Sequence, residues 1–516
     1  MKKRVFVMFA VFFSSIFFLI GCSKDSSTEA SGDANNKNDD TLIIAQASDI
    51  TTMDPQNSLS TTGDRVFRNM YNRLFYWDDG VEIEAELVED YDQVDDTTWH
   101  FTLKDGVTFH NDDQLTADDV KFSLERVMTD DTLKEFPYFT QLKEVNVLDD
   151  LEFEIITDGA MPTLLKVLAK SGADILPKDY FEEMGLEEFQ KNPVGSGPYK
   201  YIDWIHDDKV VLEAYQDYFD GEPKWEEVEV RSIPESSTRV GELMTGGVDL
   251  ATDIPPNEWD RVESKDSVEL IEGETTRVNL LMVRTTEGTV TEDPKVREAI
   301  DLAIDKQAIV DSLLKGTATP IRTRVPEEVF GSNTDLYDTQ VHDVEKAKEL
   351  LAEAGYPDGV ELTFTASKGR YPLDGEVAEL ITAMLGEVGF DVNLKLLESS
   401  AFVDEYSSNS NEELLMIGLA DGLLDASYSL VHYTKDRAEG QTDYFNEEVE
   451  DLFQQAGRNL DESERAKQYQ RIQEIVAEER PHIFLYQQGV NYGINKELEF
   501  NPVINEAILF DEVNKN

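Results

Sequence analysis

Residues 360–398 have the sequence VELTFTASKGRYPLDGEVAELITAMLGEVGFDVNLKLLE, and this stretch decides the fold class. Apolar and polar residues alternate at its two ends, which is typical of half-buried strands. Between the ends, apolar residues recur three and four positions apart, as on the buried face of a helix. The strand positions are Val360, Leu362, Phe364, Ala366, Val392, Leu394 and Leu396, and the helix positions are Val377, Leu380, Ile381, Met384, Leu385 and Val388. We therefore predict a βαβ unit whose parallel strands are joined by a right-handed crossover.

Two further segments extend this pattern. The apolar residues 414–419 follow the unit and can supply another strand of the same sheet. Earlier in the chain, residues 228–233, 236–245 and 248–250 repeat the order strand, helix, strand. The two units predict an α/β protein with two separate open sheets.

Length and charge limit the classes of function. The 516 residues exceed the roughly 100 to 200 residues of one domain, so we expect two or more lobes. Asp and Glu number 107 against 46 Lys and Arg, a formal charge of −61. A field of that sign repels nucleic acid and anionic membrane surfaces.

Sequence motifs for catalysis are missing. The chain contains no HExxH, GxSxG or GxGxxG motif and no Gly-Lys dipeptide, and its six histidines lack metal-ligand spacing. We expect no enzyme activity, no metal and no cofactor. A secreted hydrolase that uses two carboxylates stays open, because 107 acidic residues single out no pair.

The first residues indicate export. A basic start, Met1 to Arg4, precedes the apolar residues 5–20 and ends in Leu-Ile-Gly-Cys at Cys22, the only cysteine of the chain. This end resembles a bacterial lipobox, which implies that Cys22 is lipidated and begins the mature protein. Residues 23–41 are polar and should form a flexible tether. We expect a protein at the outer face of the cell membrane, held only by its lipid anchor.

Charged loops follow two of the predicted parallel strands. Ligands of open parallel sheets bind beyond the carboxyl ends of the strands. Arg370 follows the first strand, and Asp421 and Asp425 follow residues 414–419. A guanidinium suits a carboxylate and an aspartate suits an ammonium, so these groups could hold a zwitterion such as a peptide by its ends. An internal salt bridge or solvated charges are the alternatives.

Short segments spread along the chain form a recognisable set. They are TMDP (52–55), FTLKDGVTFH (101–110), LTADDV (115–120), NPVGSGPY (192–199), VREAI (296–300), AID (303–305), LAEAGY (351–356) and the helix of residues 465–479. We interpret residues 194–199 as a structural turn with special backbone angles. Together the segments resemble, in the family's order and over nearly the whole chain after the tether, the large peptide-type solute-binding proteins of ABC importers, solute-binding family 5.

The resemblance implies a periplasmic-binding-protein-like fold of class II type, in which a solute is held between two lobes joined by crossing strands. It also implies an extra subdomain in the first lobe. The expected division is a signal peptide (1–22), a tether (23–41), a first lobe (42–78, 193–285 and 483–516), its extra subdomain (79–192) and a second lobe (286–482).

The resemblance also assigns ligand-binding roles. It implies that Arg370 meets a peptide carboxylate and that an aspartate after residues 414–419 meets the amino end. Thr52 and Met53 would pair with the peptide backbone, and Phe402 would line a side-chain pocket.

The sequence departs from the family at one loop. The family commonly has a Trp after the strand's glycine and an Asp four residues past it. Here Leu419 follows Gly418, Asp421 lies three residues past it and Asp425 seven. The amino-end anchor is therefore open between the two aspartates, and Leu419 implies altered pocket contents.

The implied function is capture of a short peptide by a monomer that delivers it to ABC permease subunits with cytoplasmic ATPases. A non-peptide solute such as a nickel chelate or a sugar is the alternative within the same fold. A receptor domain that reports a peptide without importing it is a further one.

Overall fold

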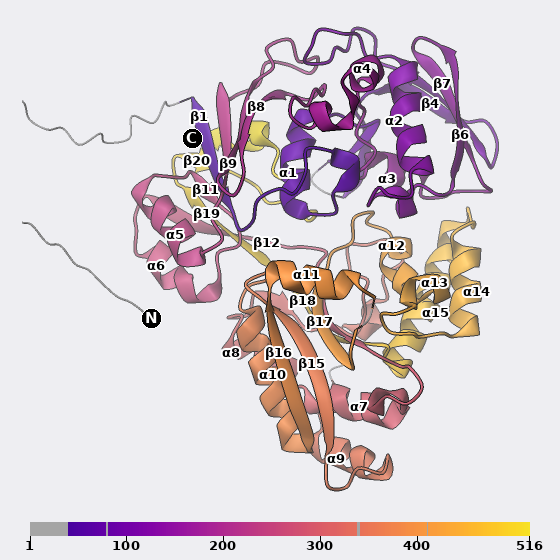
Figure 1. Ribbon diagram of the computed structural model, residues 1–516, viewed down its shortest axis with the longest axis vertical. Coiled ribbons are helices and arrows are strands. Elements are labelled where there is room, and N and C mark those ends of the chain that lie inside the picture. Colours follow the sequence, from indigo (N-terminus) through magenta and orange to yellow (C-terminus); the bar gives the residue numbers. More distant parts are fainter. Residues whose placement is uncertain (1–39, 79–80, 338–340, 410) are drawn as a thin grey trace, which may run out of the picture. The chain divides into compact units, whose positions relative to one another are not determined.

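The computed structural model describes residues 40–78, 81–337, 341–409 and 411–516. The expected signal peptide, Cys22 and the tether as far as residue 39 lie outside these residues. The described residues form a seven-stranded, a six-stranded and a four-stranded sheet and two small two-stranded sheets (Figure 1). Within the described ranges, no helix is both long and apolar enough to cross a membrane.

The seven-stranded sheet has the strand order β12, β19, β11, β1, β10, β9, β8. β1 is parallel to β10 and to β11, and α5 (Ser236–Thr245) connects those two strands in the chain. This confirms the unit predicted at residues 228–250 and places β1 between its strands. The strands are β1 (Thr41–Gln46), β8 (Tyr199–Ile205), β9 (Lys209–Ala214), β10 (Glu227–Ser232), β11 (Leu250–Ala251), β12 (Val268–Gly273) and β19 (Val490–Asn495), with α1 (Thr61–Met70) packed in the same core and α6 (Trp259–Glu263) before β12.

The four-stranded sheet is antiparallel, in the order β4, β5, β7, β6, and packs against α2 (Ala117–Thr129). α2 begins at a capping box, because the Asp119 carboxylate accepts hydrogen bonds from the backbone N–H and the hydroxyl of Thr116. The remaining elements of this part are β2 (Phe75–Asp78), β3 (Glu82–Ala85), β4 (Val88–Gln93), β5 (Thr98–Leu103), η2 (Phe136–Tyr138), β6 (Leu142–Asp149), β7 (Glu152–Thr157), α3 (Leu164–Ala169) and α4 (Lys178–Phe189).

The six-stranded sheet has the order β14, β18, β13, β17, β15, β16. β15 is parallel to β16 and to β17, so the predicted βαβ unit and its third strand are confirmed. α10 (Asp374–Val388) lies along β15 and β16 (Figure 1) and buries the predicted apolar face against them. The strands are β13 (Val278–Val283), β14 (Ala318–Thr319), β15 (Val360–Lys368), β16 (Phe390–Glu398), β17 (Leu414–Leu419) and β18 (His482–Gln488).

Helices of the same part follow and connect these strands. α12 begins directly after the loop that follows β17. The helices are α7 (Pro294–Ala303), α8 (Lys306–Ser312), α9 (Val344–Glu353), α10 (Asp374–Val388), α11 (Ser399–Ser407), α12 (Ala426–Leu430), α13 (Lys435–Ala438), α14 (Glu447–Ala456) and α15 (Glu462–Glu479); a two-stranded sheet of β20 (Leu498–Glu499) and β21 (Asn514–Lys515) closes the chain.

Two strands of the six-stranded sheet come from segments that were expected in the first lobe. The segments 193–285 and 483–516 contain β13 and most of β18, and both strands pair in the six-stranded sheet. Both strands are buried nearly throughout. The lobe boundaries stay predictions.

The turn at residues 194–199 is structural, as predicted, but close packing and not backbone angle requires its glycines. Neither Gly195 nor Gly197 has a positive φ. A Cβ at Gly195 would lie 2.0 Å from the carbonyl oxygen of Met70, at the end of α1. His110 fixes the turn, since its Nε2 lies 2.9 Å from the Gly197 carbonyl oxygen and its Nδ1 accepts the Gly195 N–H at 3.2 Å.

Candidate functional site

A cavity of about 140 Å³ is lined by residues from both lobes. One wall comes from the start of α1, from β2 and from the end of α3, and another from the loop after β17 and from α12. An adjoining cavity of about 150 Å³ shares four of its lining residues. The charged side chains that line the first cavity are those of Asp64, Arg73, Glu135, Lys170, Asp421 and Glu506, and Trp77 and Tyr428 add aromatic rings.

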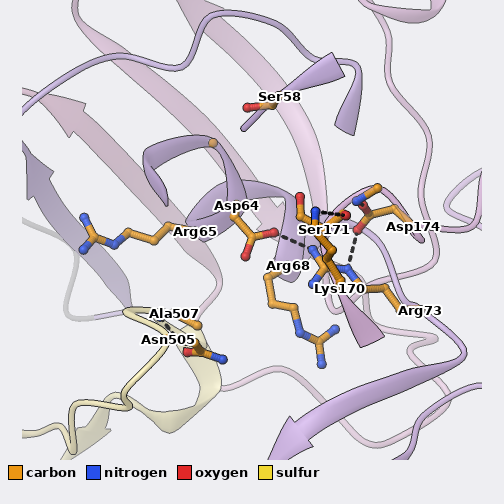
Figure 2. A network of polar contacts seen from close by, with 12 residues as sticks. Ser58, Asp64, Arg65, Arg68, Arg73, Lys170, Ser171, Asp174, Asn505 and Ala507 are labelled. Atoms are coloured by element: carbon orange, nitrogen blue, oxygen red, sulfur yellow. Dashed lines mark hydrogen bonds and ion pairs between the residues drawn. The ribbon is translucent and has the colours of Figure 1, made fainter. Parts of the chain in front are cut away.

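Arg73 joins two carboxylates in the cavity wall (Figure 2). Its Nε donates to Asp174 Oδ1 at 2.9 Å, its Nη2 to Asp64 Oδ1 at 2.5 Å and its Nη1 to the Ala169 carbonyl oxygen at 3.1 Å. The side chains of Asp174 and Arg73 are 0% and 4% exposed, whereas that of Asp64 is 31% exposed. The Arg73 guanidinium is therefore buried between one inaccessible and one accessible carboxylate.

Asp64 is held in its charged form. It lies in the first turn of α1, where unpaired backbone N–H groups favour a negative charge. Burial by itself raises the pKa of Asp64, but the charge and hydrogen bond of Arg73, followed by Arg68 and Lys170, bring that pKa below its usual value. An ionised carboxylate thus faces the cavity at neutral pH.

Lys170 and Glu135 form a second buried pair. Lys170 Nζ donates to the Glu135 carboxylate and, at 3.0 Å, to the Ser171 carbonyl oxygen. The ammonium lies 4.4 Å from the ring centre of Tyr138, and Tyr138 stacks on Tyr428 at 4.7 Å. Burial raises the pKa of Glu135 to about 7, although Lys170 opposes that rise. Because an ammonium has three N–H donors, these two acceptors leave one donor for the cavity.

Asp421 lines the cavity, but its oxygens already serve the loop. Oδ1 accepts the Leu423 N–H at 3.0 Å, and Oδ2 accepts the Ser429 hydroxyl at 2.5 Å. The Thr276 hydroxyl bonds to both backbone groups of Asp421. Asp421 is 2% exposed, and burial raises its pKa. The hydrogen bonds of the Asp421 carboxylate therefore stabilise the loop in which it lies.

Asp425 does not reach the cavity. Its side chain is fully buried, and Oδ1 accepts from Arg465 Nη2 at 2.5 Å and from the Ser427 backbone N–H at 3.1 Å. Oδ2 lies 3.4 Å from Lys166 Nζ. Of the alternatives left open for Asp425, the internal ion pair is the one that the structure contains.

Arg370 lies at the same sheet edge as Asp421, as the parallel pairing of β15 and β17 requires, but outside the cavity lining. Its side chain is exposed, and its Nε donates to the Tyr371 hydroxyl at 3.0 Å. That hydroxyl donates to the Gly418 carbonyl oxygen at 2.9 Å. The half-buried Leu419 follows, with its own carbonyl accepting a hydrogen bond from Arg324.

The other three expected ligand-binding residues do not line the cavity. Met53 is buried in the core of the first lobe, and Phe402 in a core of the second. The Thr52 hydroxyl donates to Gln190 Oε1 at 2.8 Å and accepts the Asp54 N–H at 3.0 Å. Their apolar or hydroxyl side chains are satisfied within the fold, so any contact with a ligand would fall to backbone atoms.

Sequence reasoning missed five of the six charged residues that line the cavity, namely Asp64, Arg73, Glu135, Lys170 and Glu506. They meet through contacts between residues as much as 101 positions apart, as for Arg73 and Asp174. No local pattern singles these residues out, since Arg73 follows Asn72 and Lys170 precedes Ser171 in mixed stretches. No cluster of three or more His, Cys, Asp or Glu side chains suited to a metal ion occurs among the described residues.

Known proteins resemble the chain over most of its length. The glutathione-binding protein GsiB of Salmonella paratyphi A is 26% identical over 469 residues, which cover 89% of this chain and 91% of GsiB. The solved structure of DppA from Helicobacter pylori, in complex with the peptide STSA, has 26% identity and a TM-score of 0.83 and covers 92% of this chain and 98% of DppA.

A nickel-binding relative shares the fold. NikA from Staphylococcus aureus in complex with Ni(L-His)2 has 24% identity and a TM-score of 0.81, and covers 92% of this chain and 100% of NikA. The family model described as bacterial extracellular solute-binding proteins, family 5 Middle, matches residues 82–441. The chain therefore belongs to the bacterial extracellular solute-binding proteins of family 5.

Proposed function

We propose that this protein captures a short peptide between its two lobes and delivers it to the permease of an ABC importer. The observation that carries the proposal is the mixed charge of the cavity, where both acidic and basic side chains come from the wall around Asp64, Arg73 and Lys170. A zwitterion can satisfy groups of both signs at once, whereas a sugar can satisfy neither with a full charge. The role is one of binding, and no catalytic step is assigned to the cavity.

Two relatives support a peptide ligand. GsiB is named for glutathione, and the DppA structure contains the tetrapeptide STSA. The similarity covers 89% and 92% of this chain, respectively, and most of each relative.

Arg370 fits the proposal as a carboxylate anchor. Its guanidinium is exposed at the sheet edge beside the cavity loop and keeps donors that Tyr371 does not use. Asp421 is a candidate for the amino end from within the cavity lining. The backbone atoms of Thr52 and Met53 are candidates for contacts with the peptide backbone.

The proposal includes the cellular setting. An export signal ending at Cys22 would place the protein outside the cell membrane with a lipid anchor, as a monomer whose partners are the permease and its cytoplasmic ATPases. The acidic surface, with a formal charge of −61, suits a solvent-exposed protein without nucleic-acid partners.

The test is thermal melting of the chain from Ser23 onward against panels of peptides, amino acids, sugars and nickel chelates. A ligand that binds only the native state raises the melting temperature by mass action. A rise with peptides that exceeds every other panel supports the proposal. A rise with sugars or nickel chelates alone would refute the peptide ligand, and hydrolysis of any panel member would refute the binding role.

A further inference from the structure

The carboxylates of the cavity differ in what they leave for a ligand. Glu506 places Oε1 2.8 Å from Arg277 and Oε2 3.6 Å from Arg65, and its side chain is 7% exposed. Asp421 gives both oxygens to its own loop, and Glu135, 1% exposed, is paired with Lys170. These three carboxylates are neutralised or hydrogen-bonded inside the fold.

Asp64 is the exception. Only its Oδ1 has a hydrogen-bond partner among the described residues, the Arg73 guanidinium, and its side chain is 31% exposed. A carboxylate has about four lone-pair sites on its two oxygens, so Oδ2 can accept further hydrogen bonds. Asp64 also lines both adjoining cavities, which places it where they meet.

The balance of charge leads to the same residue. The Arg73 guanidinium is already matched by Asp174, whose side chain is fully buried. The other two cations of this wall have their own partners, because Lys170 pairs with Glu135, and Arg68 pairs with Glu86 at 2.8 Å. Asp64 is therefore the surplus negative charge, and it is the accessible one.

We propose that Asp64 receives the positively charged amino group of the bound solute in this cavity, and that Arg73, fixed by Asp174, acts as the positioning residue that holds Asp64 Oδ1. This inference rests on the proposed function and names the ligand class more narrowly, as solutes with a free primary ammonium group. Asp425 is excluded from that role by its burial. Asp64 replaces Asp421 as the candidate for the amino end, because both Asp421 oxygens accept hydrogen bonds from their own loop.

The test compares a tripeptide library that has free amino ends with the same library after N-acetylation. Apparent affinity is taken from the concentration dependence of the melting temperature. For the unmodified protein, the acetylated library should need at least a tenfold higher concentration. In Asp64→Asn, the free library should bind about 10- to 100-fold more weakly, the range for a hydrogen bond to a charged group, and acetylation should no longer matter.

Two variants guard the interpretation. Asp64→Glu keeps the charge and should keep the preference for free amino ends, which separates loss of charge from misfolding. Asp118→Asn removes an exposed aspartate from the first turn of α2, lines neither cavity and should bind like the unmodified protein.

The outcomes separate the two levels of the claim. If Asp64→Asn still discriminates against the acetylated library, or if Asp421→Asn alone abolishes that discrimination, the amino group is not at Asp64, while peptide binding stands. If the unmodified protein responds to neither library, the proposed function itself fails, and the assignment of Asp64 fails with it.

Discussion

Replacing Asp425 with Ala should destabilise the protein without removing a ligand contact. The Asp425 carboxylate is fully buried, accepts from Arg465 Nη2 at 2.5 Å and caps α12 through Ser427. Removing it leaves the Arg465 guanidinium, 4% exposed, without its counter-charge between the rings of Phe330 and Tyr469. Breaking a buried ion pair on one side costs about 3–5 kcal/mol.

The assay is urea unfolding at neutral pH, followed by circular dichroism, for Asp425→Ala and a matched control. Asp451→Ala changes an exposed aspartate on α14 and should stay within about 0.5 kcal/mol of the unmodified protein. The double variant Asp425→Ala, Arg465→Leu should regain part of the loss, because no unpaired charge remains buried.

One result would refute this reasoning. If Asp425→Ala unfolds within about 1 kcal/mol of the unmodified protein but loses peptide affinity at least tenfold, the carboxylate serves a ligand and not the internal pair. The residue that binds the peptide amino group would then be Asp425, in the loop after β17.

Three further predictions concern stability. Gly195→Ala should cost about 3 kcal/mol in urea unfolding, because its Cβ would lie 2.0 Å from a backbone oxygen, whereas Gly386→Ala on α10, with open space around it, should stabilise by about 0.5–1 kcal/mol; equal effects would contradict the packing argument. Burial lowers the pKa of His110 to about 4 in the folded protein. In the unfolded chain, its pKa is about 6.5, so between pH 6.5 and pH 4 the unfolded chain binds a proton that the folded protein does not. Stability should fall by about 3 kcal/mol as pH drops between those values, and His110→Gln should flatten the fall; an unchanged pH profile in that variant would refute the assignment. Tyr138→Ala and Tyr428→Ala each remove one ring of a stacked pair. The loss in unfolding free energy of the double variant should differ from the sum of the two single losses by about 0.5–1.5 kcal/mol, and strict additivity would argue against the stacking.

The sequence predicted the architecture well where the patterns were local. Alternation and helical spacing located β15, α10 and β16, and the parallel pairing followed from their order. The edge that carries the loops of Arg370 and Asp421 followed in turn, since parallel strands end on the same side. Strands β13 and β18 were not predicted, because they are buried nearly throughout and carry no alternation of apolar and polar residues.

The site was predicted only in part, and the reason is physical. Asp421 could be placed because it follows a recognisable strand, but whether a side chain is already hydrogen-bonded depends on neighbours distant in sequence. Asp425 forms an ion pair with Arg465, 40 residues away, and Arg73 forms one with Asp174, 101 residues away. Such pairings require the folded chain, so the accessible charge of Asp64 could not emerge from spacing alone.

The most direct measurement is a crystal structure of the chain from Ser23 onward grown with the tripeptide library. We expect a peptide in the cavity lined by Asp64, Lys170 and Asp421, with its amino nitrogen within hydrogen-bond distance of Asp64 Oδ2. A peptide whose amino end meets Asp421 would contradict the assignment of Asp64, and a solute without a peptide bond in that cavity would contradict the account as a whole.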